Sequence, residues 1–208
     1  MGNNGNLEDD RVQLALTYTQ AAENASQLGA DPSKGFVVGG TSAGGNLAAT
    51  IAHLARDEKL SPPLTGCHLM IPAICAVNVL PQKYMKDQHS WEQNKDAAVL
   101  SRKACDMFYD CYIPPSERDN ELFSPLLFKT GHAGLPPTYL QICGQDPLRD
   151  EALIYERVLR EEDGIKTKVD VYPGLPHGFW SIFPKLESSK RFVEESVKGV
   201  QWLQEQHK

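Results

Sequence analysis

The stretch that decides the fold reads Gly35-Phe-Val-Val-Gly-Gly-Thr-Ser-Ala-Gly-Gly-Asn-Leu-Ala48. It opens with a short apolar run, residues 35–39, which is typical of a fully buried strand. A helical pattern follows, because Leu47, Ile51 and Leu54 are spaced by four and then three residues. The sequence therefore predicts a strand that turns sharply into a helix.

Gly40, Ser42 and Gly44 fill the pattern Gly-x-Ser-x-Gly at this turn. A serine on such a turn has strained backbone angles, and we expect its neighbours two before and two after to lack side chains so that the turn can close. The hydroxyl then projects at the carboxyl edge of the sheet, beside a helix N-terminus that favours developing negative charge. A chance match in a glycine-rich loop is the alternative, but the flanking strand and helix favour a nucleophile at Ser42.

Serine is a weak nucleophile unless a base takes its proton, and His177 is the predicted base. It lies in Pro173-Gly-Leu-Pro-His-Gly-Phe179, directly after a period-two strand at 168–172. The end of that strand lies at the same sheet edge as Ser42, and we expect Gly178 to allow close approach.

The other five histidines fit less well, and we expect solvated or core imidazoles rather than bases. Two of them, on the helix after the turn and inside a strand at 67–71, lie within predicted elements; one is terminal, and two fall within residues 73–134. They are His53, His68, His207, His89 and His132.

The acid of such a site is expected one strand earlier, at the same edge. A strand at 138–142 leads into Gly144-Gln-Asp-Pro-Leu-Arg-Asp150, where Asp146 is the first carboxylate after the strand. Asp150 is the runner-up. It and Glu151 fall at a helix start, where acids commonly serve capping and dipole roles.

Helices and strands alternate along the rest of the chain. Further helical patterns cover residues 14–28 and 148–159, and Val193, Val197 and Val200 mark a last helix. This order predicts an α/β fold, a mostly parallel sheet with helices on both faces. We interpret the chain as a single domain, residues 1–208. Residues 73–134, with scattered prolines and aromatic residues, form an insertion or cap within it.

The composition is that of an ordinary globular protein, with 41% hydrophobic and 23% charged residues in 208. The net charge of −6 argues against a nucleic-acid binder. The sequence contains no apolar run of about 18 residues, so we expect no membrane span.

The N-terminal residues and the cysteines predict a cytoplasmic protein. The start, Met1-Gly-Asn-Asn-Gly-Asn6, has neither a secretory pattern nor the serine or threonine of a myristoylation site. The five cysteines include no Cys-x-x-Cys pair, which favours free thiols in a reducing compartment over a disulfide framework or a zinc site.

Five motifs together resemble the hormone-sensitive-lipase branch of the α/β-hydrolase fold, whose members are carboxylesterases and lipases. The resemblance covers nearly the whole chain, from about Asp9 to the last helix. The motifs are Gly-Thr-Ser-Ala-Gly-Gly-Asn-Leu-Ala (40–48), Ser-Pro-Leu (124–126), Leu-Pro-Pro (135–137), Gly-Gln-Asp-Pro-Leu-Arg-Asp-Glu (144–151) and Pro-His-Gly-Phe (176–179).

This resemblance implies a serine hydrolase acting on small-molecule carboxylic esters. Ser42, Asp146 and His177 match the family's catalytic triad, and Ala43 N–H matches an oxyanion donor. The resemblance also implies that no metal or organic cofactor takes part, and that residues 73–134 hold part of the family's cap.

The chain also departs from the family pattern. Members carry a His-Gly-Gly-Gly oxyanion loop well upstream of the serine, but only 41 residues precede Ser42 here and none has that pattern. The first four strands of the family's sheet are also missing, as expected for a truncated product, a fragment or a protomer that pairs edge to edge. The strand at 35–39 is then open on one side, and an open apolar edge favours a homodimer.

Two other functions remain open at this point. The first is a non-catalytic small-molecule-binding protein on the same fold, similar to the plant gibberellin receptors. Such receptors typically lose the histidine that this chain keeps as His177. The second is an inactive remnant, which the missing loop would favour.

Overall fold

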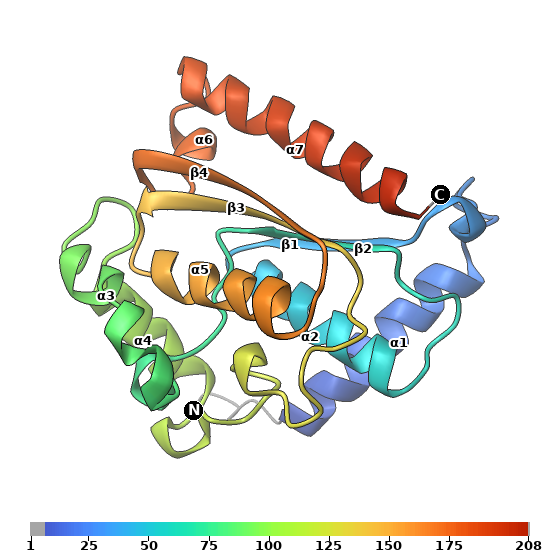
Figure 1. The fold of residues 1–208 in the computed structure, drawn as a ribbon, viewed down its shortest axis with the longest axis horizontal. Coiled ribbons are helices and arrows are strands. Elements are labelled where there is room, and N and C mark those ends of the chain that lie inside the picture. The colour runs from blue at the N-terminus through green and yellow to red at the C-terminus, as the bar shows by residue number, and fades with distance from the viewer. Residues whose placement is uncertain (1–6, 208) are drawn as a thin grey trace.

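A four-stranded parallel sheet forms the centre of the protein in the computed structural model, which describes residues 7–207 (Figure 1). The strands follow one another across the sheet in chain order: β1 (Val37–Thr41), β2 (Gly66–Met70), β3 (Thr138–Gln145) and β4 (Thr167–Pro176). Since all four strands run the same way, their carboxyl ends meet at one edge. The predicted α/β fold is confirmed.

Helices cover both faces of this sheet (Figure 1). Helices α2 (Ala43–Asp57) and α5 (Arg149–Arg157) lie on one face, and α7 (Glu187–Gln206) crosses the other. The first helix, α1 (Leu7–Glu23), packs on α2 rather than on the sheet. The two central strands are thus covered by α2 and α5 on one face and by α7 on the other.

Residues 73–134 contain short helices in place of strands. Two of them, α3 (Ser90–Gln93) and α4 (Arg102–Tyr112), pack beside the loop that follows β3 (Figure 1). A further short helix, α6 (Phe179–Ile182), follows β4. That residues 73–134 act as a cap stays a prediction. The remaining turns are 3₁₀ turns at Pro32–Lys34, Val77–Val79, Gln82–Asp87, Pro115–Glu117 and Pro125–Leu127, and a π turn at Val158–Glu162 that extends α5.

The core lies on both faces of the two central strands. Leu69 and Leu140 are fully buried between the sheet and α2, whose alanines let the helix lie close to the strands. On the other side, Phe179 and Phe192 pack against Tyr172 near the carboxyl ends of β3 and β4. This second cluster anchors the loop that leaves β4, where His177 lies.

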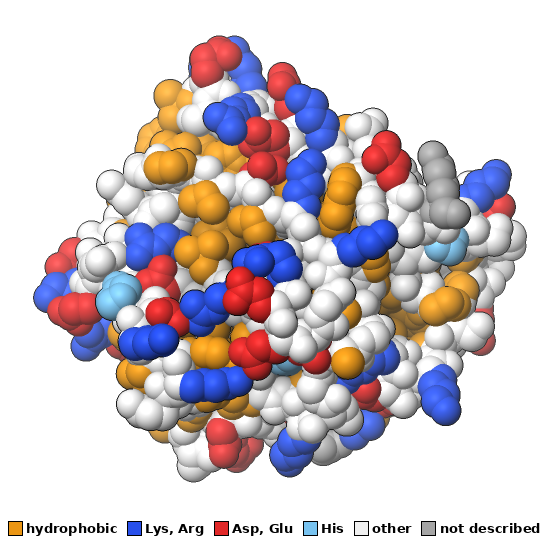
Figure 2. Space-filling model, viewed as in Figure 1, with side chains coloured by type: hydrophobic (Ala, Val, Ile, Leu, Met, Phe, Trp, Pro, Cys, Tyr) orange, Lys and Arg blue, Asp and Glu red, His pale blue; other side chains and the backbone are white. Residues whose placement is uncertain are grey.

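The two outer strands are less covered than the central pair. Strand β1 is only partly buried, whereas four of the five residues of β2 are buried. At the opposite side, apolar side chains gather over β4 and α6 (Figure 2), and Val171 of β4 is 41% exposed. The predicted open edge at the first strand is therefore present among the described residues.

Some predicted element boundaries were wrong, while the predicted last helix is present as α7. The first strand begins at Val37 and runs to Thr41, two residues later than expected. The first helix ends at Glu23 and leaves Leu28 outside it. Val193 and Val197 lie on α7 but face solvent, because α7 packs through other residues, Phe192 and Leu203 among them.

Three further expectations concern location. Among residues 7–207, no helix combines the length and the apolar character that a bilayer span needs. All five cysteines are free thiols, and four of them are buried. The reducing cytoplasm that they suggest stays a prediction, as does the expectation of no secretory leader, which falls on residues 1–6, outside the described part.

Candidate active site

Ser42 lies between β1 and α2, at the N-cap of that helix. Its backbone has φ 57° and ψ −118°, so this residue has the left-handed φ that non-glycine residues rarely adopt. Its N–H donates to the carbonyl of Met70 (2.8 Å), and its carbonyl accepts from Asn46 N–H (3.1 Å). The strained serine predicted for this turn is confirmed, and hydrogen bonds on both sides hold it.

The two glycines around Ser42 are not equivalent. A Cβ on Gly40 would lie 2.1 Å from the carbonyl oxygen of Gly44, so only glycine fits there. A Cβ on Gly44 would meet nothing within 4 Å. The expectation that both neighbours must lack side chains is thus correct for Gly40 and wrong for Gly44. Gly45 is the second tight position, since its Cβ would lie 2.9 Å from Pro72.

His177 joins the serine to the acid. Its Nε2 lies 2.9 Å from Oγ of Ser42, and its Nδ1 lies 2.6 Å from Oδ2 of Asp146. The carboxylate can only accept, so Nδ1–H donates to Asp146 and Nε2 accepts from the serine hydroxyl. The structure thus brings together the three side chains that the sequence singles out, in the arrangement that general-base activation of serine needs.

Asp146 is almost completely buried, at 1% exposure, and is held from several sides. Its second carboxylate oxygen accepts from the N–H of Leu148 (2.9 Å), and its carbonyl accepts from Nδ2 of Asn94 (3.0 Å). The guanidinium of Arg149 donates to the carbonyl of Gly144, two residues before it (3.0 Å). The carboxylate that faces His177 is therefore fixed in orientation.

Asp150, the runner-up acid, faces away from His177 and toward α3. Its Oδ2 accepts from the backbone N–H groups of His89 and Ser90, each at 2.7 Å, and Arg149 pairs with it. Burial favours its neutral form, but these donors outweigh burial and lower the pKa of Asp150. The structure gives Asp150 the role of joining the insertion to the loop after β3.

Ser90 completes this junction. Its N–H donates to Asp150, its hydroxyl donates to the carbonyl of Pro147 (2.7 Å), and the same hydroxyl accepts from Asp150 N–H (3.1 Å). Ser90 is fully buried. Sequence reasoning missed Ser90 and Asn94, because nothing in the local pattern of the insertion indicates that it touches residues 144–150.

His177 directly follows β4, and the next residue turns the chain into α6. Gly178 has φ +67° and is the N-cap of that helix. A Cβ there would come no closer than 3.8 Å to another residue, so the glycine serves the left-handed backbone rather than the predicted close approach.

Four of the other five histidines have ring partners away from Ser42, and the fifth, His89, donates its backbone N–H to Asp150. His53 donates from Nδ1 to the carbonyl of Ala49 (2.8 Å), and its Nε2 lies 2.8 Å from Nδ1 of His132. His68 bonds Gln141 (3.0 Å), and His207 lies 3.3 Å from a carbonyl oxygen. Burial lowers the pKa of His53 to about 3, so it is a neutral core residue.

An apolar pocket of about 250 Å³ opens beside the serine. It begins at Ala43, the first residue of α2, whose N–H belongs to the helix turn that lacks intrahelical partners. The rest of the wall comes from α2, from residues 73–76 after β2, from α4 and from Phe123. Its lining residues are Ala43, Asn46, Leu47, Ala73, Cys75, Ala76, Phe108, Tyr109, Tyr112 and Phe123.

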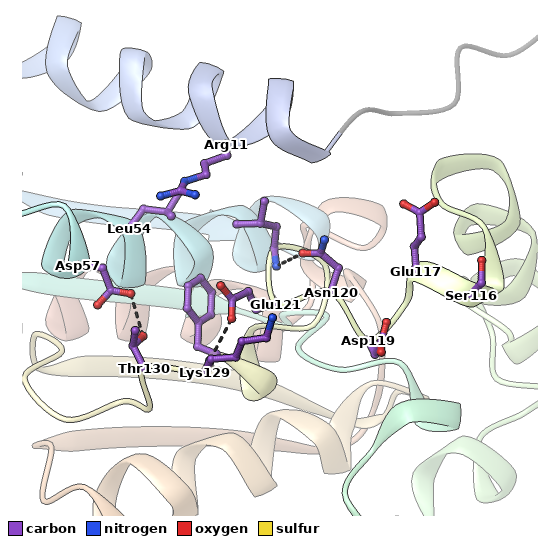
Figure 3. A pocket seen from close by; sticks show the side chains of 12 residues that line it. Arg11, Leu54, Asp57, Ser116, Glu117, Asp119, Asn120, Glu121, Lys129 and Thr130 are labelled. Atoms are coloured by element: carbon purple, nitrogen blue, oxygen red, sulfur yellow. Dashed lines mark hydrogen bonds between the residues drawn. The ribbon is translucent and has the colours of Figure 1, made fainter.

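A larger pocket of about 500 Å³ lies between α1, α2 and residues 116–130 (Figure 3). Its acids bond locally: Asp57 accepts from Thr130, and Glu121 accepts from the N–H of Lys129. The described residues that line the two pockets do not include Ser42, Asp146 or His177, but Ala43 of the smaller pocket directly follows the serine in the chain. Within residues 7–207, no group of three or more histidine, cysteine or acidic side chains has the arrangement of a metal site.

Comparison with known proteins identifies the family to which this chain is similar. The sequence profile of the alpha/beta hydrolase fold family matches residues 12–181. An AB hydrolase superfamily protein of Schizosaccharomyces pombe is 40% identical over 187 residues, which is 90% of this chain and 54% of that protein. Versiconal hemiacetal acetate esterase of Dothistroma septosporum is 39% identical over 193 residues, 92% of this chain and 57% of that one.

The solved structures agree. The crystal structure of vibralactone cyclase superposes with a TM-score of 0.88 at 39% identity, covering 97% of this chain and 57% of that one. The chain therefore spans little more than half the length of the relatives that it matches.

Proposed function

The chain belongs to the α/β-hydrolase fold family, and on that premise we propose that it is a serine hydrolase of carboxylic esters. The observation that carries the proposal is the bridge that His177 makes between Ser42 and Asp146. Relatives that are 30% or more identical include esterases, which favours ester hydrolysis over the other reactions that this fold supports.

In the proposed mechanism, Ser42 Oγ attacks the acyl carbon while His177 Nε2 takes the hydroxyl proton. Asp146 accepts from His177 Nδ1, so it holds the ring in the required tautomer and stabilises the imidazolium that forms. His177 then gives its proton to the leaving alcohol, and an acyl-enzyme remains on Ser42. Water, deprotonated by the same imidazole, releases the acid and restores the serine.

The ester is expected to carry an apolar group that fits the pocket beside Ala43. The aromatic side chains of Tyr109, Tyr112 and Phe123 and the aliphatic side chain of Leu47 offer mainly dispersion contacts and burial. A volume of about 250 Å³ suits a short to medium hydrocarbon group rather than a polymer or a peptide.

The oxyanion of the tetrahedral intermediate is the weak point of the site. We assign the oxyanion to Ala43 N–H, and the position of Ala43 at the start of α2 supports this assignment. A single missing donor typically costs about 10²–10³ in rate. We therefore propose slow hydrolysis of activated short-chain esters such as p-nitrophenyl acetate, whose good leaving group needs little general-acid help. Unactivated esters react far more slowly.

Active-site labelling separates this proposal from its rival. A fluorophosphonate probe should label Ser42 covalently, and the Ser42→Ala variant should neither take up the label nor hydrolyse p-nitrophenyl acetate above background. Absence of labelling in a folded chain would overturn the proposal and favour a non-catalytic binding protein. The non-catalytic alternative is favoured by one feature: only one oxyanion donor, Ala43 N–H, is assigned among the described residues.

A further inference from the structure

A carboxylic acid lies fully buried behind the wall of the apolar pocket. Glu151, in the first turn of α5, has no exposed surface. Its Oε1 accepts from the N–H of Ile74 (2.6 Å) and from the N–H of Cys75 (3.2 Å). Its Oε2 has no hydrogen-bond partner among the described residues. An acid at a helix start is expected to face solvent, so this burial calls for an explanation.

The two amides that Glu151 holds lie within residues 73–76, the segment that follows β2. Three members of this segment, Ala73, Cys75 and Ala76, line the pocket beside Ser42. The segment is also tied at its ends, because Asn46 of α2 donates to the carbonyl of Ala73 (2.9 Å) and Ala76 N–H donates to Ser124 (3.3 Å). Glu151 supplies the acceptor for the middle of the segment.

We propose that Glu151 is a positioning residue, which as a neutral acid holds residues 73–76 in place as one wall of the substrate pocket. The proposal rests on the proposed function, because it assigns that pocket to the acyl or alcohol group of the ester. Glu151 acts on the substrate through the segment and does not touch the reacting atoms.

The charges around Glu151 explain why the neutral form is the one that works. Burial raises the pKa of Glu151 to about 8; the two amide hydrogen bonds oppose this rise, and the nearby carboxylates of Asp146 and Asp150 add to it. An ionised Oε2 would lie buried, without a donor, near two other acids. Ionisation above about pH 8 therefore favours opening of the segment to water.

Three further titratable groups interact with the charge of Glu151, and none of the three is cationic, while the guanidinium of Arg149 pairs with Asp150. Cys75, Cys105 and Tyr109 are close enough to feel its charge. Burial raises the pKa of both thiols to about 12 and that of the Tyr109 phenol well above its ordinary value. All three stay protonated and neutral while Glu151 titrates.

Two substitutions isolate this role. Glu151→Gln keeps a carbonyl oxygen for the two amides and cannot ionise, whereas Glu151→Leu removes the acceptor at similar size. The direct readout is hydrogen-exchange protection of the amides of Ile74 and Cys75 between pH 6 and 9, corrected for intrinsic exchange. This readout needs no catalysis.

Wild-type protection should hold to about pH 8 and fall above it, and Glu151→Gln should keep its protection across the range. In Glu151→Leu, the protection factors of these two amides should fall at least about tenfold at every pH, because each amide loses its buried acceptor. Equal pH profiles for wild type and Glu151→Gln would overturn the proposal, and this comparison stands even where Glu151→Leu does not fold.

Labelling of Ser42 gives the functional readout. Glu151→Leu should slow labelling by a long-alkyl fluorophosphonate about tenfold more than it slows labelling by the methyl probe. Glu151→Gln should leave the ratio of the two labelling rates unchanged at pH 7. An unchanged chain-length preference in a folded Glu151→Leu variant would overturn the proposal. If wild type shows the pH break in exchange but no labelling, the proposed function fails while the role of Glu151 in the wall stands.

Discussion

The Nε2 atom of His177 lies 2.9 Å from Oγ of Ser42, although 135 positions separate the two residues in the chain. The parallel sheet produces this contact. Ser42 follows β1 and His177 follows β4, so both leave the sheet at its carboxyl edge. The loop after β3, between them in chain order, brings Asp146 to the same place.

Asp146 and Asp150 should differ sharply in their effect on turnover. Asp146→Asn replaces a carboxylate oxygen with an amide NH₂ that can donate to His177 Nδ1, which favours the wrong tautomer and removes the charge that stabilises the imidazolium, so kcat should fall by about 10⁴. Asp150→Asn leaves His177 untouched and should stay within about tenfold of wild type. The measurement is p-nitrophenyl acetate hydrolysis by both variants. A larger loss from Asp150→Asn would show that the wrong acid was assigned.

The two glycines that flank the serine provide a matched pair for stability. Gly40→Ala puts a Cβ 2.1 Å from a backbone oxygen that cannot move freely, so it should lower the free energy of unfolding by about 1–3 kcal/mol or more. Gly44→Ala meets open space inside a helix and should be neutral or stabilising by about 0.5–1 kcal/mol. Urea unfolding of both variants checks this, and equal losses would contradict it.

Acidification should destabilise the protein through His53. Burial lowers the pKa of His53 to about 3 from 6.5, so the unfolded chain binds this proton more readily than the folded chain. The contribution of neutral His53 to the free energy of unfolding is fully present above pH 6.5. It falls by up to about 1.4 kcal/mol per pH unit between pH 6.5 and 3. Chemical denaturation of wild type and His53→Gln at pH 7, 6 and 5 measures this. Parallel curves for the two proteins would count against it.

Filling the apolar pocket should change the preferred ester. Leu47 lines the pocket and is 37% exposed, so Leu47→Trp can occupy space that an acyl chain would use. The ratio of kcat/KM for octanoate over acetate should fall about tenfold, equivalent to the burial of about two methylene groups. Val193→Trp, on the solvent face of α7, is the control. An unchanged ratio for Leu47→Trp would remove the pocket from substrate binding.

Self-association should occur through β1. This outer strand is only partly buried and carries valines, the combination that favours edge pairing. Light scattering should show concentration-dependent dimers, which Val37→Lys should reduce. Val171→Lys on the opposite outer strand β4 should leave them intact. A monomer at every concentration in wild type would refute the homodimer.

Local sequence patterns were sufficient to predict the sharp turn at Ser42 and the order of the candidate site residues along the chain. The pattern around Ser42 specifies a strand, a strained turn and a helix, all of which are set by neighbouring residues. The sequence favours Asp146 as the first carboxylate after its strand, and the structure decides between the two acids, because Asp146 contacts His177 while Asp150 binds the backbone of His89 and Ser90. A run of sequence cannot show that exclusion, since the partners lie about 60 positions away.

Burial was harder to predict than secondary structure. Glu151 has the sequence position of a helix-start acid, yet the packing of residues 73–76 against α5 encloses it. The spacing of Val193 and Val197 predicts the last helix but not its buried side, and both valines are more than half exposed. Both outcomes depend on which segments meet in three dimensions, and a periodicity carries no information about that.

The exchange of hydrogen bonds between Ser90 and Asp150 has an evolutionary consequence. Residues 73–134 and the start of α5 each satisfy backbone N–H groups of the other, so a change in one segment is expected to require a matching change in the other. A chimaera that takes residues 73–134 from a homologue without a matching hydroxyl at position 90 would loosen the loop that carries Asp146. Position 90 is therefore one of the buried points at which residues 73–134 are matched to the loop that carries Asp146.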